Sequence, residues 1–184
     1  MFHKKLNSAM NRIKKALLWI HYKLFSNSLH GTHSPFVYKF LEQVVYKTMP
    51  INDEKIYLHS SYLNNKKYNE LLLRMIHYFN VSTVIESYHK PESDVLNLIE
   101  KLNAIELMIF DIKKNNDEIY EHSLKKINER SIFVFDGIRT NDYQLKFWKK
   151  IQNDNRTIVT IDLFEIGIIF FRTQQPKENF LIDY

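Results

Sequence analysis

Apolar residues follow two different spacings along this 184-residue chain, and the two spacings alternate from residue 66 onward. Positions three and four apart predict amphipathic helices, whereas short runs rich in β-branched residues predict buried strands. The helical spacing covers 66–79, 92–102, 117–129 and 141–151. The strand-like runs cover 81–86, 105–112, 131–136, 156–163, 166–171 and 179–184. This alternation predicts an α/β sheet that is parallel in its first part. The short connection after residue 163 predicts one antiparallel strand near the C-terminus.

The first 25 residues carry an apolar stripe with the spacing of one helix face. Its members are Leu6, Met10, Ile13, Leu17, Ile20 and Leu24, and Trp19 and Phe25 widen it. Residues 1–41 contain seven lysines and arginines and no acidic residue, so this arm holds the basic character of a chain whose net charge is +5. Such a helix can lie on an anionic membrane surface, dock on a partner protein or fold back on its own domain. We favour the last interpretation, because amphipathic helices usually face their own core. Nucleic acid is the weakest candidate partner, because the basic residues are not interleaved with aromatic residues along a strand.

The stretch HGTHSPFVYKF at residues 30–40 places two histidines beside the start of a helix. Ser34 suits the N-cap position, and Pro35 suits the first helical position, where its missing N–H would have no partner anyway. Apolar residues at helical spacing follow. Two histidines three residues apart are too few ligands for a zinc site. We therefore expect a helix corner and no metal site here.

Three longer segments carry a family resemblance: HGTHSPFVYKFLEQVV (30–45), SIFVFDGIRTNDYQLKFWKKI (131–151) and TIDLFEIGIIFFRTQQPKENFLIDY (160–184). They resemble, in this order, the N-terminal signature, the fifth strand with its following helix, and the C-terminal end of a family of class I S-adenosylmethionine-dependent methyltransferase-like proteins common in Bacteroidota. The resemblance implies a Rossmann-like methyltransferase fold. Such a fold has a mostly parallel sheet with an antiparallel C-terminal strand, here preceded by N-terminal helices.

The middle of the chain departs from this family in two ways. The family's first strand leads into a glycine-rich loop, because the backbone there must approach the cofactor closely. In this chain the loop 87–93 reads SYHKPES, and the whole chain has only three glycines. The helix ending near Leu102 also leads directly into the strand at 105–112. One strand–helix–strand unit needs about 30 residues, so two of the family's units are missing, including the acidic residue that holds the cofactor ribose. We predict a reduced fold in which strand 81–86 lies beside strand 105–112.

Four residues at the predicted strand ends remain as candidates for a cofactor or metal site: Glu86, Tyr88, Asp111 and Asp136. Open α/β sheets bind ligands at the carboxyl ends of their strands. By resemblance, Glu86 matches the acid that ends the family's first strand. Metal-dependent O-methyltransferases hold a divalent cation with acids placed like Asp111 and Asp136. Two acids are fewer than an oxygen cage needs, so we interpret both as strand-end residues that cap the next turn. We expect no catalytic residue, no bound cofactor and no metal.

These observations favour a non-catalytic protein of the methyltransferase fold that acts as an interaction or structural subunit. Its contact surfaces would be the basic helical arm, residues 1–48, and the sheet edge that the missing strands expose in the α/β domain, residues 49–184. We expect a protein partner, with a membrane surface as the second choice and no small-molecule substrate. The alternative is an active methyltransferase that binds S-adenosylmethionine unconventionally or with a partner's residues. The absence of cysteine suits a cytoplasmic location, and the basic arm adds peripheral attachment to the inner membrane as an option.

Overall fold

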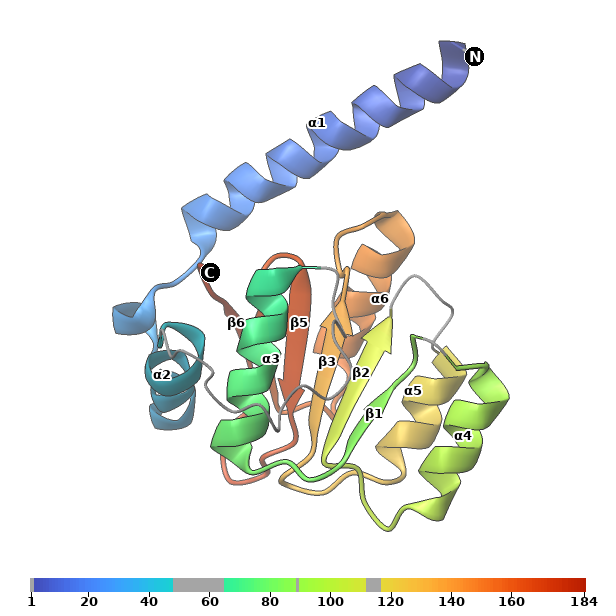
Figure 1. The fold of residues 1–184 in the computed structure, drawn as a ribbon. Coiled ribbons are helices and arrows are strands. Elements are labelled where there is room, and N and C mark those ends of the chain that lie inside the picture. The colour runs from blue at the N-terminus through green and yellow to red at the C-terminus, as the bar shows by residue number, and fades with distance from the viewer. Residues whose placement is uncertain (1, 48–64, 89, 112–116) are drawn as a thin grey trace.

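The computed structural model describes residues 2–47, 65–88, 90–111 and 117–184, and a mixed six-stranded sheet lies at the centre of these residues. Its strands are β1 (Val84–Glu86), β2 (Leu107–Asp111), β3 (Ile132–Asp136), β4 (Val159–Asp162), β5 (Ile166–Phe170) and β6 (Glu178–Leu181). They lie in the order β1-β2-β3-β5-β4-β6. Strand β5 is antiparallel to both of its neighbours, and all other neighbouring pairs are parallel. The predicted α/β class with a mostly parallel sheet is confirmed (Figure 1).

The antiparallel strand β5 lies inside the sheet, between β3 and β4. The chain reverses between β4 and β5 within residues 163–165, where Phe164 has a left-handed φ of 73°. Strand β6 then returns parallel to β4 and forms one edge of the sheet. Strand β1 forms the other edge and pairs with β2. The predicted neighbours 81–86 and 105–112 are therefore confirmed.

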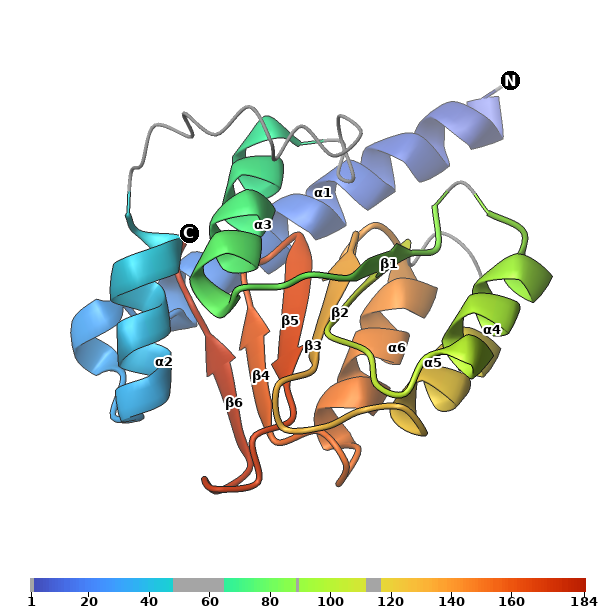
Figure 2. The same ribbon diagram turned by 60° about the horizontal axis from the view of Figure 1, so that its bottom comes forward.

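Helices cover both faces of the sheet. The helical elements are α1 (Phe2–Phe25), η1 (Leu29–Gly31), α2 (Pro35–Phe40), η2 (Leu41–Val45), α3 (Lys66–Phe79), α4 (Glu92–Lys101), α5 (Asp117–Leu124) and α6 (Asp142–Asn153). Elements α2, η2 and α3 pack on one face, and α4, α5 and α6 pack on the other (Figures 1 and 2). Successive residues of a strand point to opposite faces, so Ile109 joins the core beneath α3 while Phe110 joins the core beneath α4 to α6.

The predicted helix corner at residues 30–40 is confirmed. Pro35 takes the first position of α2, and the Ser34 side chain accepts a hydrogen bond from the Val37 N–H at 3.4 Å. The apolar residues of α2 and η2 are buried together with those of α3. The helix that the sequence placed in the N-terminal arm thus contributes to the core of the α/β body.

Strand β1 and helix α5 are among the elements that are shorter than predicted. Strand β1 begins only at Val84, because the N–H groups of Ser82 and Thr83 donate to the carboxylate of Glu106 at 2.6 and 3.0 Å. Helix α5 ends at Leu124, short of residue 129. The edge that β1 offers to a partner strand is therefore only three residues long, and short edges pair poorly. Helix α1, by comparison, is 24 residues long.

Candidate functional site

The four candidate residues at the strand ends lie together at one edge of the sheet. Asp111 ends β2 and stands in register with Asp136, which ends β3. Glu86 ends β1, and Tyr88 follows two residues later. The Tyr88 hydroxyl donates a hydrogen bond to Oδ2 of Asp136 at 2.8 Å. Because β2 separates β1 from β3, the Tyr88 side chain spans the carboxyl end of the middle strand.

The loop after β1 is fixed to this edge by short-range hydrogen bonds. The Tyr88 N–H donates to Oε2 of Glu86 at 2.6 Å, and the Asp111 N–H donates to Oγ of Ser87 at 2.9 Å. Burial of the ring, and next the charge of Asp136, raise the pKa of Tyr88. The phenol therefore stays protonated at neutral pH and continues to donate to the carboxylate.

The loop after β1 lacks the glycines that a cradle for S-adenosylmethionine would use. A cofactor cradle needs a backbone that the ligand can approach closely. Here the Tyr88 ring packs against the apolar core beneath α2 and α3, and its hydroxyl closes over the strand ends. Among the residues that the structure describes, no three histidine or acidic side chains are grouped as metal ligands. The expected absence of a cofactor and a metal remains a prediction.

A second buried polar centre, which the sequence pattern did not indicate, lies at the carboxyl end of β4. The Asp162 side chain is only 2% exposed. Arg139 donates to its two oxygens at 2.6 and 2.7 Å. Nε1 of Trp148 donates at 2.9 Å, and the N–H of Phe164 donates at 3.0 Å. Because the donors come from separate segments of the chain, no local sequence motif predicts this centre.

The Asp162 centre holds the turn between β4 and β5 in place. Arg139 also donates to the carbonyl of Phe164 at 2.8 Å. A Cβ at Gly167 would come within 2.5 Å of the Trp148 ring, so the glycine is what lets the indole reach Asp162. A glycine inside an apolar strand often marks such a close approach. That glycine was the one feature of the sequence from which the centre could have been suspected.

Helix α1 is anchored near its C-terminal end to this turn and to the C-terminal segment. Tyr22 is 2% exposed; its hydroxyl donates to the Ile182 carbonyl and accepts from the Tyr184 N–H. The centre of its ring lies 5.1 Å from that of Phe164. Just beyond the helix, Asn27 forms a parallel bridge with Ile182. These contacts attach α1 to the edge of the sheet at β6.

Ion pairs orient the same side of α1 toward the body. They join Lys14 to Asp142, Lys15 to Glu165 and Lys23 to Asp183. All six side chains are more than one third exposed, so each pair adds little to stability. Together with Tyr22, however, they determine which side of the helix faces the protein.

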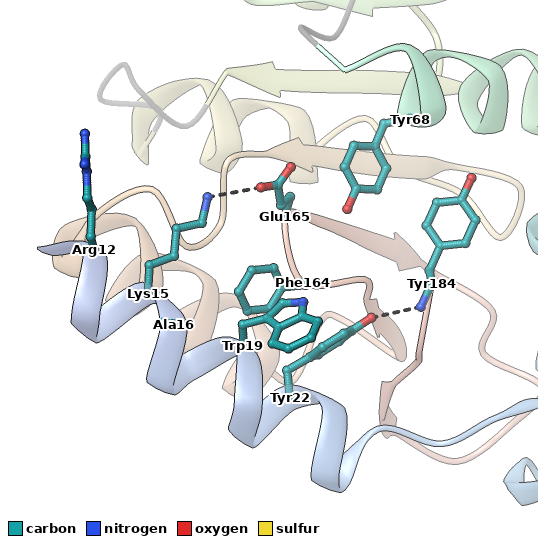
Figure 3. A pocket seen from close by; sticks show the side chains of 9 residues that line it. All are labelled: Arg12, Lys15, Ala16, Trp19, Tyr22, Tyr68, Phe164, Glu165 and Tyr184. Carbon is teal, nitrogen blue, oxygen red and sulfur yellow. Dashed lines mark hydrogen bonds and ion pairs between the residues drawn. The ribbon is translucent and has the colours of Figure 1, made fainter.

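An open groove of about 500 Å³ lies between α1 and the body (Figure 3). Its lining residues are Arg12, Lys15, Ala16, Trp19, Tyr22, Tyr68, Phe164, Glu165 and Tyr184. The pair of Lys15 and Glu165 spans it at one end, and Tyr22 meets Tyr184 at the other (Figure 3). The groove therefore lies over the turn between β4 and β5, and the four strand-end candidates are not part of its lining.

The apolar stripe of α1 faces away from the body. Ile13 and Leu17 are each 61% exposed, Leu24 is 74% exposed, and Phe25 beside them is 63% exposed. Of the ten large apolar side chains that are exposed in the described part of the chain, six lie on α1. The interpretation that this stripe packs on its own core is therefore wrong. The reason is that the body binds the opposite, polar side of the helix. Within the described residues, no helix combines the length and the apolar character needed to cross a bilayer.

Comparisons with known proteins assign no family to this chain. No protein-family model matches it, and no curated protein shows significant similarity to it. The methyltransferase resemblance therefore rests on residues 30–45, 131–151 and 160–184 alone.

Proposed function

We propose that this chain is a non-catalytic protein of the methyltransferase fold that works as an interaction or structural subunit, with α1 as its main contact surface. The observation that carries this proposal is the orientation of α1, which binds the body through its polar side and turns its apolar stripe outward. Contiguous exposed apolar patches on folded proteins usually mark a contact surface. A binding role accounts for the stripe, whereas catalysis at the strand ends has no use for it.

The carboxyl edge of the sheet supports the non-catalytic part of the proposal. A ligand at the ends of β1 and β2 would have to displace the half-buried Tyr88 side chain and break its hydrogen bond to Asp136. Breaking that bond would leave the carboxylate without this donor, at a cost that binding would have to offset. The loop also lacks the glycines that would let a nucleoside come close.

The test is binding of S-adenosylmethionine and S-adenosylhomocysteine to the full chain, measured by calorimetry and thermal denaturation. A ligand at a hundredfold excess over its dissociation constant stabilises the native state by about 2.7 kcal/mol, which a thermal shift detects. We expect neither heat nor a shift, both for the wild type and for Tyr88→Ala, in which the strand ends are uncovered but the loop stays free of glycine. Binding by the wild type that Glu86→Ala abolishes would refute the proposal. It would favour the alternative, an active methyltransferase with an unconventional or partner-completed cofactor site.

A further inference from the structure

We infer that α1 docks this protein on an anionic lipid surface, with its apolar stripe in the interface between headgroups and acyl chains. The inference names a partner for the interaction subunit and rests on that proposed function. It draws on the orientation of the helix, its charges and one aromatic residue.

The orientation of α1 lets a flat surface reach the stripe from Ile13 to Leu24. Residues of a helix are about 100° apart, so Lys15 and Tyr22 lie roughly opposite the line through Ile13, Leu17 and Ile20. Both of those opposite residues bind the body. Helix α1 runs along the outside of the body, and no described element covers its outer side (Figures 1 and 2). The 24-residue helix can therefore lie on a surface without leaving the body. Interfacial helices of this kind bury their apolar side by about 5–10 Å.

The charges beside the stripe select an anionic surface. Lys14 lies on one flank of the stripe, and Arg12 and Lys23 lie on the other, each roughly a right angle from its centre. The side chains of Lys14 and Lys23 remain 53% and 37% exposed although both are paired, so their long stems can turn the charge toward headgroups. Residues 1–41 contain no acid, and the acids near the flanks are those that pair with Lys14 and Lys23 from the body, Asp142 and Asp183. Basic residues held near such a surface are attracted to it.

A second copy of this chain fits the stripe less well. The stripe has the spacing of a coiled-coil seam, where residues beside the seam decide the partner by their charge. In α1 the positions beside the seam include Lys14, His21 and Lys23 and no acid. Two copies would therefore bring like charges together along the seam, which opposes association. Anionic lipid meets the same positions with the opposite charge.

An aromatic residue on the flank of the stripe also suits a lipid interface. Phe25 is 63% exposed, so its ring can be buried in lipid together with the apolar side chains of the stripe. Trp19 lies on the other side of the helix, where it lines the groove between α1 and the body (Figure 3), and it takes no part in this surface.

The test uses the full chain with vesicles of phosphatidylcholine, with or without phosphatidylglycerol. Co-sedimentation gives the bound fraction. We expect binding to the anionic vesicles to be tighter by about tenfold or more and to weaken as salt is added. Leu17→Glu should weaken binding by about tenfold or more. The matched control Leu98→Glu, which charges a leucine of α4 that is 39% exposed, should bind like the wild type.

Several results would overturn the inference. One is equal binding of the wild type to neutral and anionic vesicles. Another is a loss of binding in Leu98→Glu as large as that in Leu17→Glu. A third is that the wild type does not bind vesicles at all although its unfolding midpoint shows that it is folded. Self-association in analytical ultracentrifugation that Leu17→Glu abolishes would also overturn it, because a second copy would then cover the stripe. Failure on vesicles with no S-adenosylmethionine binding removes only the lipid partner. Cofactor binding together with vesicle binding removes only the non-catalytic function, so the two failures are distinguishable.

Discussion

Removing the guanidinium group of Arg139 tests how the turn that anchors α1 is built. Arg139 and Asp162 form an ion pair whose side chains are 9% and 2% exposed. Arg139→Met keeps the aliphatic part of the side chain but removes the hydrogen bonds from the guanidinium group. The donors to the Asp162 carboxylate that remain are Nε1 of Trp148 and the N–H of Phe164. Removing one partner of a buried pair costs about 3–5 kcal/mol. A domain is stable by about 5–15 kcal/mol in total, so the variant should lose a large part of its stability.

The assay is urea unfolding followed by far-ultraviolet circular dichroism, which gives the free energy of unfolding. The matched control Lys150→Met removes a cation from its pair with Asp117, whose two side chains are 63% and 43% exposed, and should cost less than about 1 kcal/mol. The double variant Arg139→Met/Asp162→Asn also removes the buried negative charge. It should therefore be more stable than the sum of the two single changes predicts, by about 1–3 kcal/mol. A loss in Arg139→Met no larger than in the control, or strict additivity in the double variant, would refute the reasoning.

Three further changes test other parts of the fold. Gly167→Ala places a methyl group against the Trp148 ring and should cost about 1–3 kcal/mol in urea unfolding by overpacking. Tyr22→Phe removes a buried hydroxyl that has two backbone partners; it should cost about 1–3 kcal/mol and speed hydrogen exchange in α1. Arg156 lowers the pKa of Glu121 through a hydrogen bond. The resulting stabilisation is present above the unfolded pKa and is lost as the pH falls through the lower folded value. Arg156→Gln should therefore lose less stability than the wild type between about pH 5 and pH 3, as followed by urea midpoints.

The sheet could be predicted from the sequence because its signals are local. Successive residues of a strand, such as Ile109 and Phe110, belong to opposite layers of the core, and apolar runs of this kind are visible without any tertiary information. The reversal at β5 was predictable because residues 163–165 are too few for a parallel crossover. The shortened β1 was not predictable, since it depends on the distant Glu106 side chain accepting the N–H groups of two preceding residues.

Two features could not be predicted from the local sequence pattern: the orientation of α1 and the Asp162 centre. An apolar helical stripe usually faces its own core, and nothing within residues 1–28 indicates the reverse. The outcome depends on acids that lie 128 to 160 residues further along the chain. The same holds for Asp162, whose donors come from three segments. The strand-end carboxylates were found by their position alone, but their contact with Tyr88 required the fold.

The attachment of α1 to the C-terminal segment fixes when the molecule can be completed during translation. Tyr22 leaves the ribosome early, whereas its two hydrogen-bond partners follow 160 and 162 residues later. Until then the Tyr22 hydroxyl lacks both of these partners, and α1 can use only its contacts with earlier residues such as Asp142, Phe164 and Glu165. A premature stop codon before β6 would remove the residues that bind Tyr22 and Asn27. The basic amphipathic helix would then stay covalently linked to the α/β body but would lose its fixed orientation on it.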